Sequence, residues 1–243
     1  MSFKFAGRLF GLLAGSLILS GALSAATISG VFNLTGNVQV TATEDVFGNM
    51  VIGDNQALTQ LQLTGSFSGL TPGNAATIGN LVGPNNTPPG PVTPGTPFSL
   101  PNWIVLPDGI NLDATSLPLP SNPVCGGAVT DNCVAFAGSP IVLSTQQGGG
   151  GTLATFSIFG NAHFAGAIAT SGTFAGVFSS QFPGETPLQV IASFGTTGSI
   201  TDSYSAAFVV TPSTSPVPEP ASMALFGAGL LALGFFGKKK IAK

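Results

Sequence analysis

Two cysteines are the residues of this chain best suited to covalent chemistry. Cys125 and Cys133 are separated by seven residues. A catalytic cysteine needs a nearby cation to hold it as a thiolate, and no Lys or Arg occurs between residues 27 and 215. A metal site would need two further ligands, and the lone His163 cannot supply both. In an exported protein such a pair is most simply a disulfide, with two reduced thiols as the alternative.

Carboxylates are the second group with possible chemistry. Asp108, Asn111 and Asp113 follow a predicted turn and offer oxygen atoms of the kind that Ca²⁺ prefers, so they are weak candidates for a metal site. Their spacing does not match a calcium-binding loop of the Asp-x-Asp-x-Asp-Gly type. Two carboxylates at a defined separation could also hydrolyse glycans. The simplest interpretation is a solvated acidic surface, with no catalytic residue, no resident metal and no cofactor.

The remaining motifs are weak. His163 lies in a strand-like segment, and no Gly-x-Ser-x-Gly nucleophile elbow accompanies it, so we interpret it as a residue of a sheet rather than a base. The glycines at 148–151 lack the Gly-Lys-Ser/Thr ending of a phosphate-binding loop and indicate a flexible connection.

Charge is distributed very unevenly along the chain. All the basic residues lie at the two ends, whereas residues 27–215 contain eight acids and no Lys or Arg, a net charge of −8 with His163 neutral. A domain without cations cannot neutralise phosphates, which excludes nucleic acid as a partner. We expect no salt bridge within this domain. Added salt should therefore stabilise it, and mild acidification should be tolerated.

Hydrophobic alternation predicts that β-strands position these residues. The clearest period-two run covers residues 60–68, with Leu61, Leu63 and Phe67 on one face. We expect turns at Gly36–Asn37 and at residues 47–49, and no segment keeps a helical period for three turns. Further strands are predicted at residues 28–34, 38–43, 50–52, 103–106, 141–143, 152–159, 162–169, 173–182, 188–194 and 203–210.

Two loop segments interrupt the strands. Residues 83–101 contain seven prolines, which prevent a regular ladder, and residues 116–138 include both cysteines. Many short strands joined by Gly- and Pro-rich turns favour an all-β fold. We predict a single antiparallel β-sandwich or jelly-roll-like domain over residues 27–215, a length sufficient for one sizeable core.

The N-terminal segment predicts export. Lys4 and Arg8 precede an apolar stretch at residues 9–23, and small residues follow at 24–26. This order is typical of a secretory signal peptide over residues 1–26. The alternative, a retained first transmembrane helix, fits less well because the apolar stretch is short and rich in Gly and Ser.

The C-terminal segment, residues 216–243, has three parts. Pro218, Glu219 and Pro220 precede an uncharged apolar run at residues 221–237, and Lys238, Lys239 and Lys240 follow it. The apolar run is at the short end of what spans a bilayer as a transmembrane helix. Lysines beside a span resist translocation, so they indicate its cytoplasmic end.

This order of tripeptide, apolar run and lysines closely resembles the PEP-CTERM sorting signal of Gram-negative bacteria. The resemblance implies recognition by an exosortase, a membrane-embedded cysteine protease that cuts near the tripeptide and releases the protein. The alternative is an ordinary anchor in which Glu219 and Pro220 merely start a helix. Helix initiation does not need Pro218. A residue before proline, as Glu219 is before Pro220, avoids the helical region and stays extended, as a protease substrate would be.

The body of the chain also looks like an uncharacterised β-rich body found among PEP-CTERM proteins. The residues that carry this likeness are the segment 103–109, the cysteine pair and the segment 204–208. The likeness implies no activity.

Together these patterns predict an exported, non-enzymatic structural protein of the cell surface or extracellular matrix. It would cross the inner membrane of a Gram-negative bacterium, stay membrane-anchored until an exosortase processes it, and then reach the surface or the biofilm matrix. Expected partners are the secretion machinery, the exosortase and extracellular polysaccharide. A Ca²⁺- or carbohydrate-binding surface module is the first alternative, and an extracellular glycan hydrolase is the weaker one.

Overall fold

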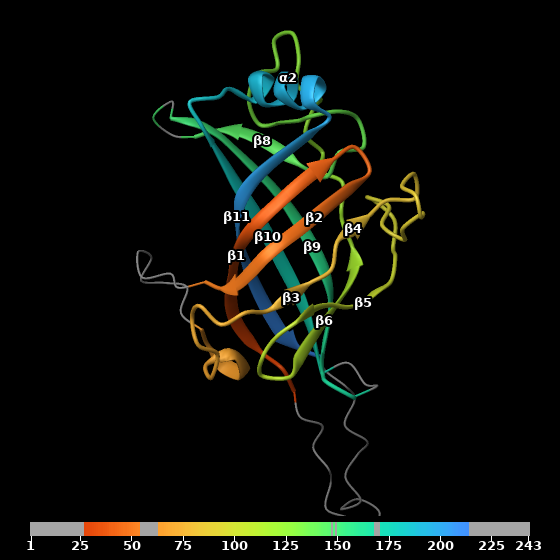
Figure 1. The fold of residues 1–243 in the computed structure, drawn as a ribbon, viewed down its shortest axis with the longest axis vertical. Coiled ribbons are helices and arrows are strands. Elements are labelled where there is room, and N and C mark those ends of the chain that lie inside the picture. The colour runs from red at the N-terminus through yellow and green to blue at the C-terminus, as the bar shows by residue number, and fades with distance from the viewer. Residues whose placement is uncertain (1–26, 54–62, 147, 149, 168–170, 214–243) are drawn as a thin grey trace, which may run out of the picture. The chain divides into compact units, whose positions relative to one another are not determined.

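Long β-strands dominate the fold (Figure 1). The computed structural model describes residues 27–53, 63–146, 148, 150–167 and 171–213. Its elements, in chain order, are β1 (Gly30–Thr41), β2 (Glu44–Ile52), the 3₁₀ turn η1 (Gly65–Phe67), β3 (Thr77–Ile78), β4 (Leu81–Val82), β5 (Leu100–Val105), β6 (Ile110–Ser116), β7 (Cys133–Val134), β8 (Val142–Thr145), β9 (Gly151–Phe164), β10 (Gly172–Pro183), α2 (Pro187–Thr197) and β11 (Ser199–Pro212).

The strands of the described residues belong to one sheet, and every pair of named strands is antiparallel. Neighbours follow the order β3-β5-β6-β9-β10-β11-β1-β2-β4, and β8, with β7 beside it, is attached to β9. β3 and β4 stand at opposite ends of this order, yet only Gly79 and Asn80 separate them along the chain. The sheet therefore curls until its two ends meet (Figure 1). The prediction of an all-β antiparallel fold is confirmed, and its form is a single curled sheet.

The core lies inside the curl because side chains alternate between the two faces of each strand. On β11, for example, Tyr204, Ala206 and Phe208 are buried, while Ser205 and Val209 face solvent. Large aromatic side chains fill most of this interior, and burying each contributes roughly 1.5–3 kcal/mol. A domain without Lys or Arg therefore holds together through apolar burial and ladder hydrogen bonds.

Residues 188–194 form a helix, so the strand predicted there is wrong. Thr186 caps α2: its side chain accepts from the Gln189 N–H, and the Gln189 side chain accepts from the Thr186 N–H. Pro187 occupies the first turn, where its missing N–H costs nothing. Gly198 ends the helix in the left-handed conformation and donates to the Phe194 carbonyl. The capping interactions at both ends favour a helix, although the alternating pattern between them would also suit a strand.

The period-two run at residues 60–68 does not form the predicted strand in the part that the structure describes. Residues 60–62 lie outside the described part of the chain, and Gly65–Phe67 forms η1 instead of a strand. Gly65 has a φ of +59°, and a Cβ at this position would come within 2.2 Å of the Ser29 carbonyl oxygen. Phe67 is nevertheless fully buried, with its ring centroid 4.6 Å from that of Phe32.

Both turns predicted near the N-terminus are wrong, because the chain continues as strand through them. β1 runs through Gly36–Asn37 with only a bulge in its pairing to β2. β2 likewise runs through residues 47–49, where Asn49 takes a positive φ of 40°.

The two terminal segments contribute nothing to this description. The predicted signal peptide at residues 1–26 and the predicted span at residues 221–237 lie outside the described residues. Among the described residues, no helix is long and apolar enough to cross a membrane.

Candidate functional site

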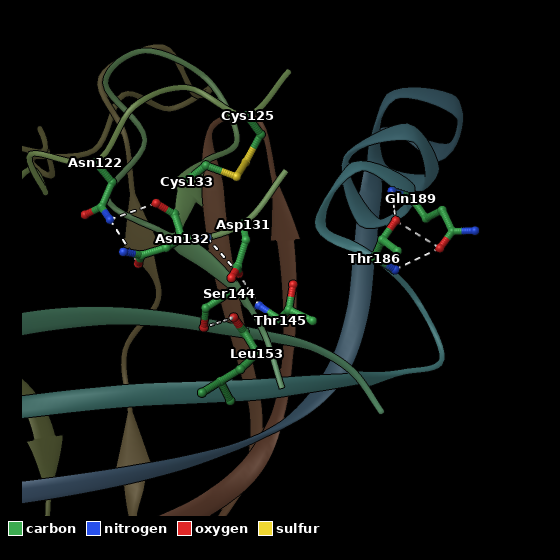
Figure 2. Close-up of a disulfide and its surroundings, with 10 residues drawn as sticks. All are labelled: Asn122, Cys125, Asp131, Asn132, Cys133, Ser144, Thr145, Leu153, Thr186 and Gln189. Carbon is green, nitrogen blue, oxygen red and sulfur yellow. Dashed lines mark hydrogen bonds between the residues drawn. A yellow bond between two sulfur atoms is a disulfide. The ribbon is translucent and has the colours of Figure 1, made fainter. Parts of the chain in front are cut away.

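The predicted disulfide is present and connects a surface loop to the edge of the sheet (Figure 2). Cys125 and Cys133 are bonded, with their Cα atoms 5.0 Å apart. Cys133 is fully buried on β7, which pairs with β8, and the Cys125 N–H donates to the Val134 carbonyl over 2.9 Å. Both cysteines are thus occupied in holding the loop, which fits a structural role.

Asp131 braces the same loop from inside the disulfide ring (Figure 2). Its carboxylate accepts the N–H of Thr145 on β8 and the N–H of Asn132. These hydrogen bonds, chiefly the one from Thr145, lower the pKa of Asp131 below its usual range. Asn122 adds a further contact, since its side-chain amide donates to the Asn132 carbonyl over 3.0 Å.

Loss of the disulfide should lower the melting temperature without unfolding the protein at room temperature. Closing so short a loop is worth about 2.5 kcal/mol on the chain-entropy model, and the aromatic core lies elsewhere. The measurement is thermal unfolding with and without a reductant. The Cys125→Ser, Cys133→Ser double variant should melt like the reduced protein and ignore the reductant. Two titratable thiols in the untreated native protein would contradict the assignment.

The three candidate Ca²⁺ ligands are divided between two places. The Asp108 carboxylate caps its own turn by accepting the Ile110 N–H over 3.0 Å. Burial raises the pKa of this carboxyl above its usual range. Asn111 and Asp113 lie two residues apart on β6, so their side chains share a face of the sheet.

Asn102 joins the latter two, and the sequence pattern gave no sign of it. It lies in a bulge of β5 with a φ of +50°. Its N–H donates to Asp113 Oδ1 over 2.7 Å, and its side-chain oxygen accepts from Asn111 Nδ2 over 2.7 Å. Among the described residues, no group of three or more His, Cys, Asp or Glu side chains gathers as metal ligands would.

His163 completes this polar cluster, which corrects the expectation that the domain forms no salt bridge. The register of β6 and β9 places His163 opposite Asn111, beside Asp113. His163 Nε2 lies 3.1 Å from Asp113 Oδ1, an ion pair whenever the imidazole is protonated. The Asp113 carboxylate thus already has polar partners from Asn102 and His163. The cluster on this face is a hydrogen-bonded network between β5, β6 and β9.

The sorting residues cannot be placed in this geometry. Pro218, Glu219, Pro220 and the three lysines at 238–240 lie outside the described residues, and their roles remain predictions from the sequence.

The comparisons with known proteins bear on that same segment. The family model of the PEP-CTERM protein-sorting motif matches residues 216–240. No curated protein and no solved structure matches the chain. The chain is therefore a β-rich protein that carries a PEP-CTERM protein-sorting motif at residues 216–240.

Proposed function

We propose that this chain is a structural protein of the cell surface or extracellular matrix, delivered there by exosortase processing of its tail. The observation that carries the proposal is the sorting motif at residues 216–240. Such a motif implies export, membrane-anchored processing and an exosortase as the processing partner. On this proposal the β domain performs no catalysis and is the cargo of the sorting reaction.

The distribution of charge supports the same topology. Lys4 and Arg8 at one end and the lysines at the other are cations that resist translocation, whereas residues 27–215 have no Lys or Arg to oppose it. One arrangement, with both ends toward the cytoplasm and the domain outside, accounts for every basic residue of the chain. The disulfide also suits an oxidising compartment outside the cytoplasm.

The hydrogen bonds that the carboxylates accept support a structural role for the β domain. The Glu44 carboxylate accepts the side-chain amides of Asn80 and Asn86, each over 2.9 Å. The Asp202 carboxylate accepts the Ser180 hydroxyl over 2.9 Å. Like Asp108 and Asp131, these acids serve as hydrogen-bond acceptors that hold loops and strands together.

The Glu219→Ala variant is expected to be exported but not cut, in a host that has the processing protease. Glu219 is the sole charge between Asp202 and Lys238, so its carboxylate is the natural recognition point of the tripeptide. Immunoblots of envelope fractions should show a larger, membrane-retained species. Glu185→Ala is the matched control, because it removes an acid outside the motif, and it should be processed normally. Normal processing of Glu219→Ala would contradict recognition of this carboxylate by the exosortase and would leave the tripeptide only the role of starting a helix.

A further inference from the structure

The interior of the curled sheet is filled unevenly along its length. Away from α2, the rings of Trp103, Phe174 and Phe208 pack against one another. At the end covered by α2, which lies at the top of Figure 1, a pocket of about 360 Å³ remains. Small-molecule sites in proteins typically measure about 300–1,000 Å³. The space is large enough for a ligand, and its walls are mainly apolar side chains.

Three aromatic residues form the floor of this pocket. The centroid of the Tyr204 ring lies 5.5 Å from that of Phe47 and 5.3 Å from that of Phe178. Tyr204 is only 4% exposed, and its buried hydroxyl oxygen has no hydrogen-bond partner in the part of the chain that the structure describes. Buried tyrosine hydroxyls normally have a partner. Because solvent does not reach this oxygen, Tyr204 offers the pocket the carbon atoms of its ring and not its hydroxyl.

The helix α2 forms the roof. Val190, Ile191 and Phe194 line the pocket from one face of the helix, while Ala192 and Ser193 are exposed on the other. An isolated helix of this length is marginal in water, so packing over the pocket and its two caps must stabilise it. The roof is therefore a short helix between β10 and β11, and it takes no part in the hydrogen-bond ladder of the sheet.

The charges around the pocket restrict what it can hold. Glu44, Asp45 and Asp202 line it, and residues 27–213 contain no Lys or Arg. Nothing in this lining could pair with the carboxylate of a fatty acid or the phosphate of a phospholipid. Burial, with a smaller contribution from the charge of Glu44, raises the pKa of Asp45 to about 7, because these surroundings disfavour a negative charge.

We propose that this pocket binds an uncharged, mainly apolar small molecule. The aromatic floor and the apolar face of α2 enclose the body of the ligand. The acidic lining and the lack of cations reject anionic ligands. This proposal does not depend on the sorting motif, so the two can fail separately.

The test uses two naphthalene dyes that differ in charge. Prodan is uncharged, whereas anilinonaphthalene sulfonate is an anion. The protein isolated from its host is titrated with each dye, and binding is followed by the rise and blue shift of dye emission. Prodan should bind saturably, and the sulfonate should bind at least about tenfold more weakly, because its charge has no partner in the pocket. Equal affinity for the two dyes would overturn the proposal.

Variants locate the bound dye. Ile191→Trp fills the pocket from the roof and should weaken prodan binding about tenfold or more. Ala192→Trp, the matched control, adds the same side chain to the exposed face of α2 and should leave the affinity unchanged. Thermal melting of each variant verifies its fold. Unchanged binding in Ile191→Trp, or equal losses in both tryptophan variants, would place the dye elsewhere and refute the proposal.

Discussion

The Trp103→Ala variant is expected to lose about 3–5 kcal/mol of unfolding free energy, since large-to-small changes in a core remove packing and leave a cavity. Trp103 is 1% exposed, and its ring centroid lies 5.8–6.5 Å from those of four phenylalanines. Its indole N–H also donates to the Gly79 carbonyl over 2.7 Å, at the junction between β3 and β4. The substitution therefore weakens both the core and the point where the sheet closes. Such a loss is a large part of the 5–15 kcal/mol typical of a folded domain.

Two further variants separate these contributions. Trp103→Phe keeps an aromatic ring but not the hydrogen bond to Gly79, so its loss should be clearly smaller. Val177→Ala, at a strand position that is 47% exposed, should change stability by less than about 0.5 kcal/mol. Urea unfolding followed by circular dichroism measures all three. An alanine variant as stable as the wild type would show that the aromatic cluster does not govern stability.

The sheet could be predicted from the sequence because its longest strands carry a simple alternation. The segments predicted at 173–182 and 203–210 fall within β10 and β11, where one face packs on the core and the other is exposed. Alternation of this kind is a local property, and it is visible without knowing what each strand pairs with. The curl is different, because it depends on which strands pair across large separations in sequence.

The helix α2 shows how a local pattern can satisfy two structures at once. Leu188, Val190 and Phe194 fit a period of two, but Val190, Ile191 and Phe194 also fit a helical stripe. The caps decide between them, and their signals were present in the sequence. Thr186 and Gln189 have the spacing of a capping box, and Gly198 follows the last turn. A prediction that ranked these capping signals above the alternation would have identified the helix.

The pocket could not be found from the sequence, because its residues are distant along the chain. Asp45 and Tyr204 belong to strands on either side of β1. The pairing of β1 places Gly36 opposite Tyr204 and Val40 opposite Asp45, so the tyrosine ring lies over a residue without a side chain. The same limit applies to His163 and Asp113, which meet only through the register of β6 and β9.

Asp45 carries the second large prediction. Its partners across the ladders are Val40 on β1 and Leu81 on β4, and it lines the apolar pocket. Burial raises its pKa from an ordinary 3.8 to about 7, and the neighbouring charge of Glu44 contributes. A raised carboxyl pKa means that the ionised form destabilises the fold. The cost is fully present above about pH 7 and is relieved as the pH falls toward 4, below which the unfolded chain is protonated as well.

We therefore expect the protein to become more stable as the pH falls from about 8 to about 5. The Asp45→Asn variant should lack most of that gain in stability. One pKa unit corresponds to about 1.4 kcal/mol, so the difference between 3.8 and about 7 sets an upper bound of about 4 kcal/mol. At the higher pH the variant should melt above the wild type. At the lower pH the gap should be clearly smaller, and the two should coincide only below about pH 4, where the carboxyl of the wild type is neutral in the folded and the unfolded state.

Asp131→Asn provides the opposite sign as a control. Hydrogen bonds from Thr145 and Asn132 lower the pKa of Asp131, so its carboxylate stabilises the fold above the ordinary pKa of the group and loses that effect in acid. This variant should melt below the wild type at neutral pH, whereas Asp45→Asn should melt above it. The melting temperature of Asp131→Asn should approach that of the wild type as the pH falls. Calorimetric melting of the three proteins from about pH 8 to below about pH 4 checks both signs, because the contribution of Asp131 is lost only below its ordinary pKa. If Asp45→Asn and the wild type followed the same pH curve, Asp45 would be an ordinary surface carboxylate, and the pocket would have to be wetter and more open than its apolar lining implies.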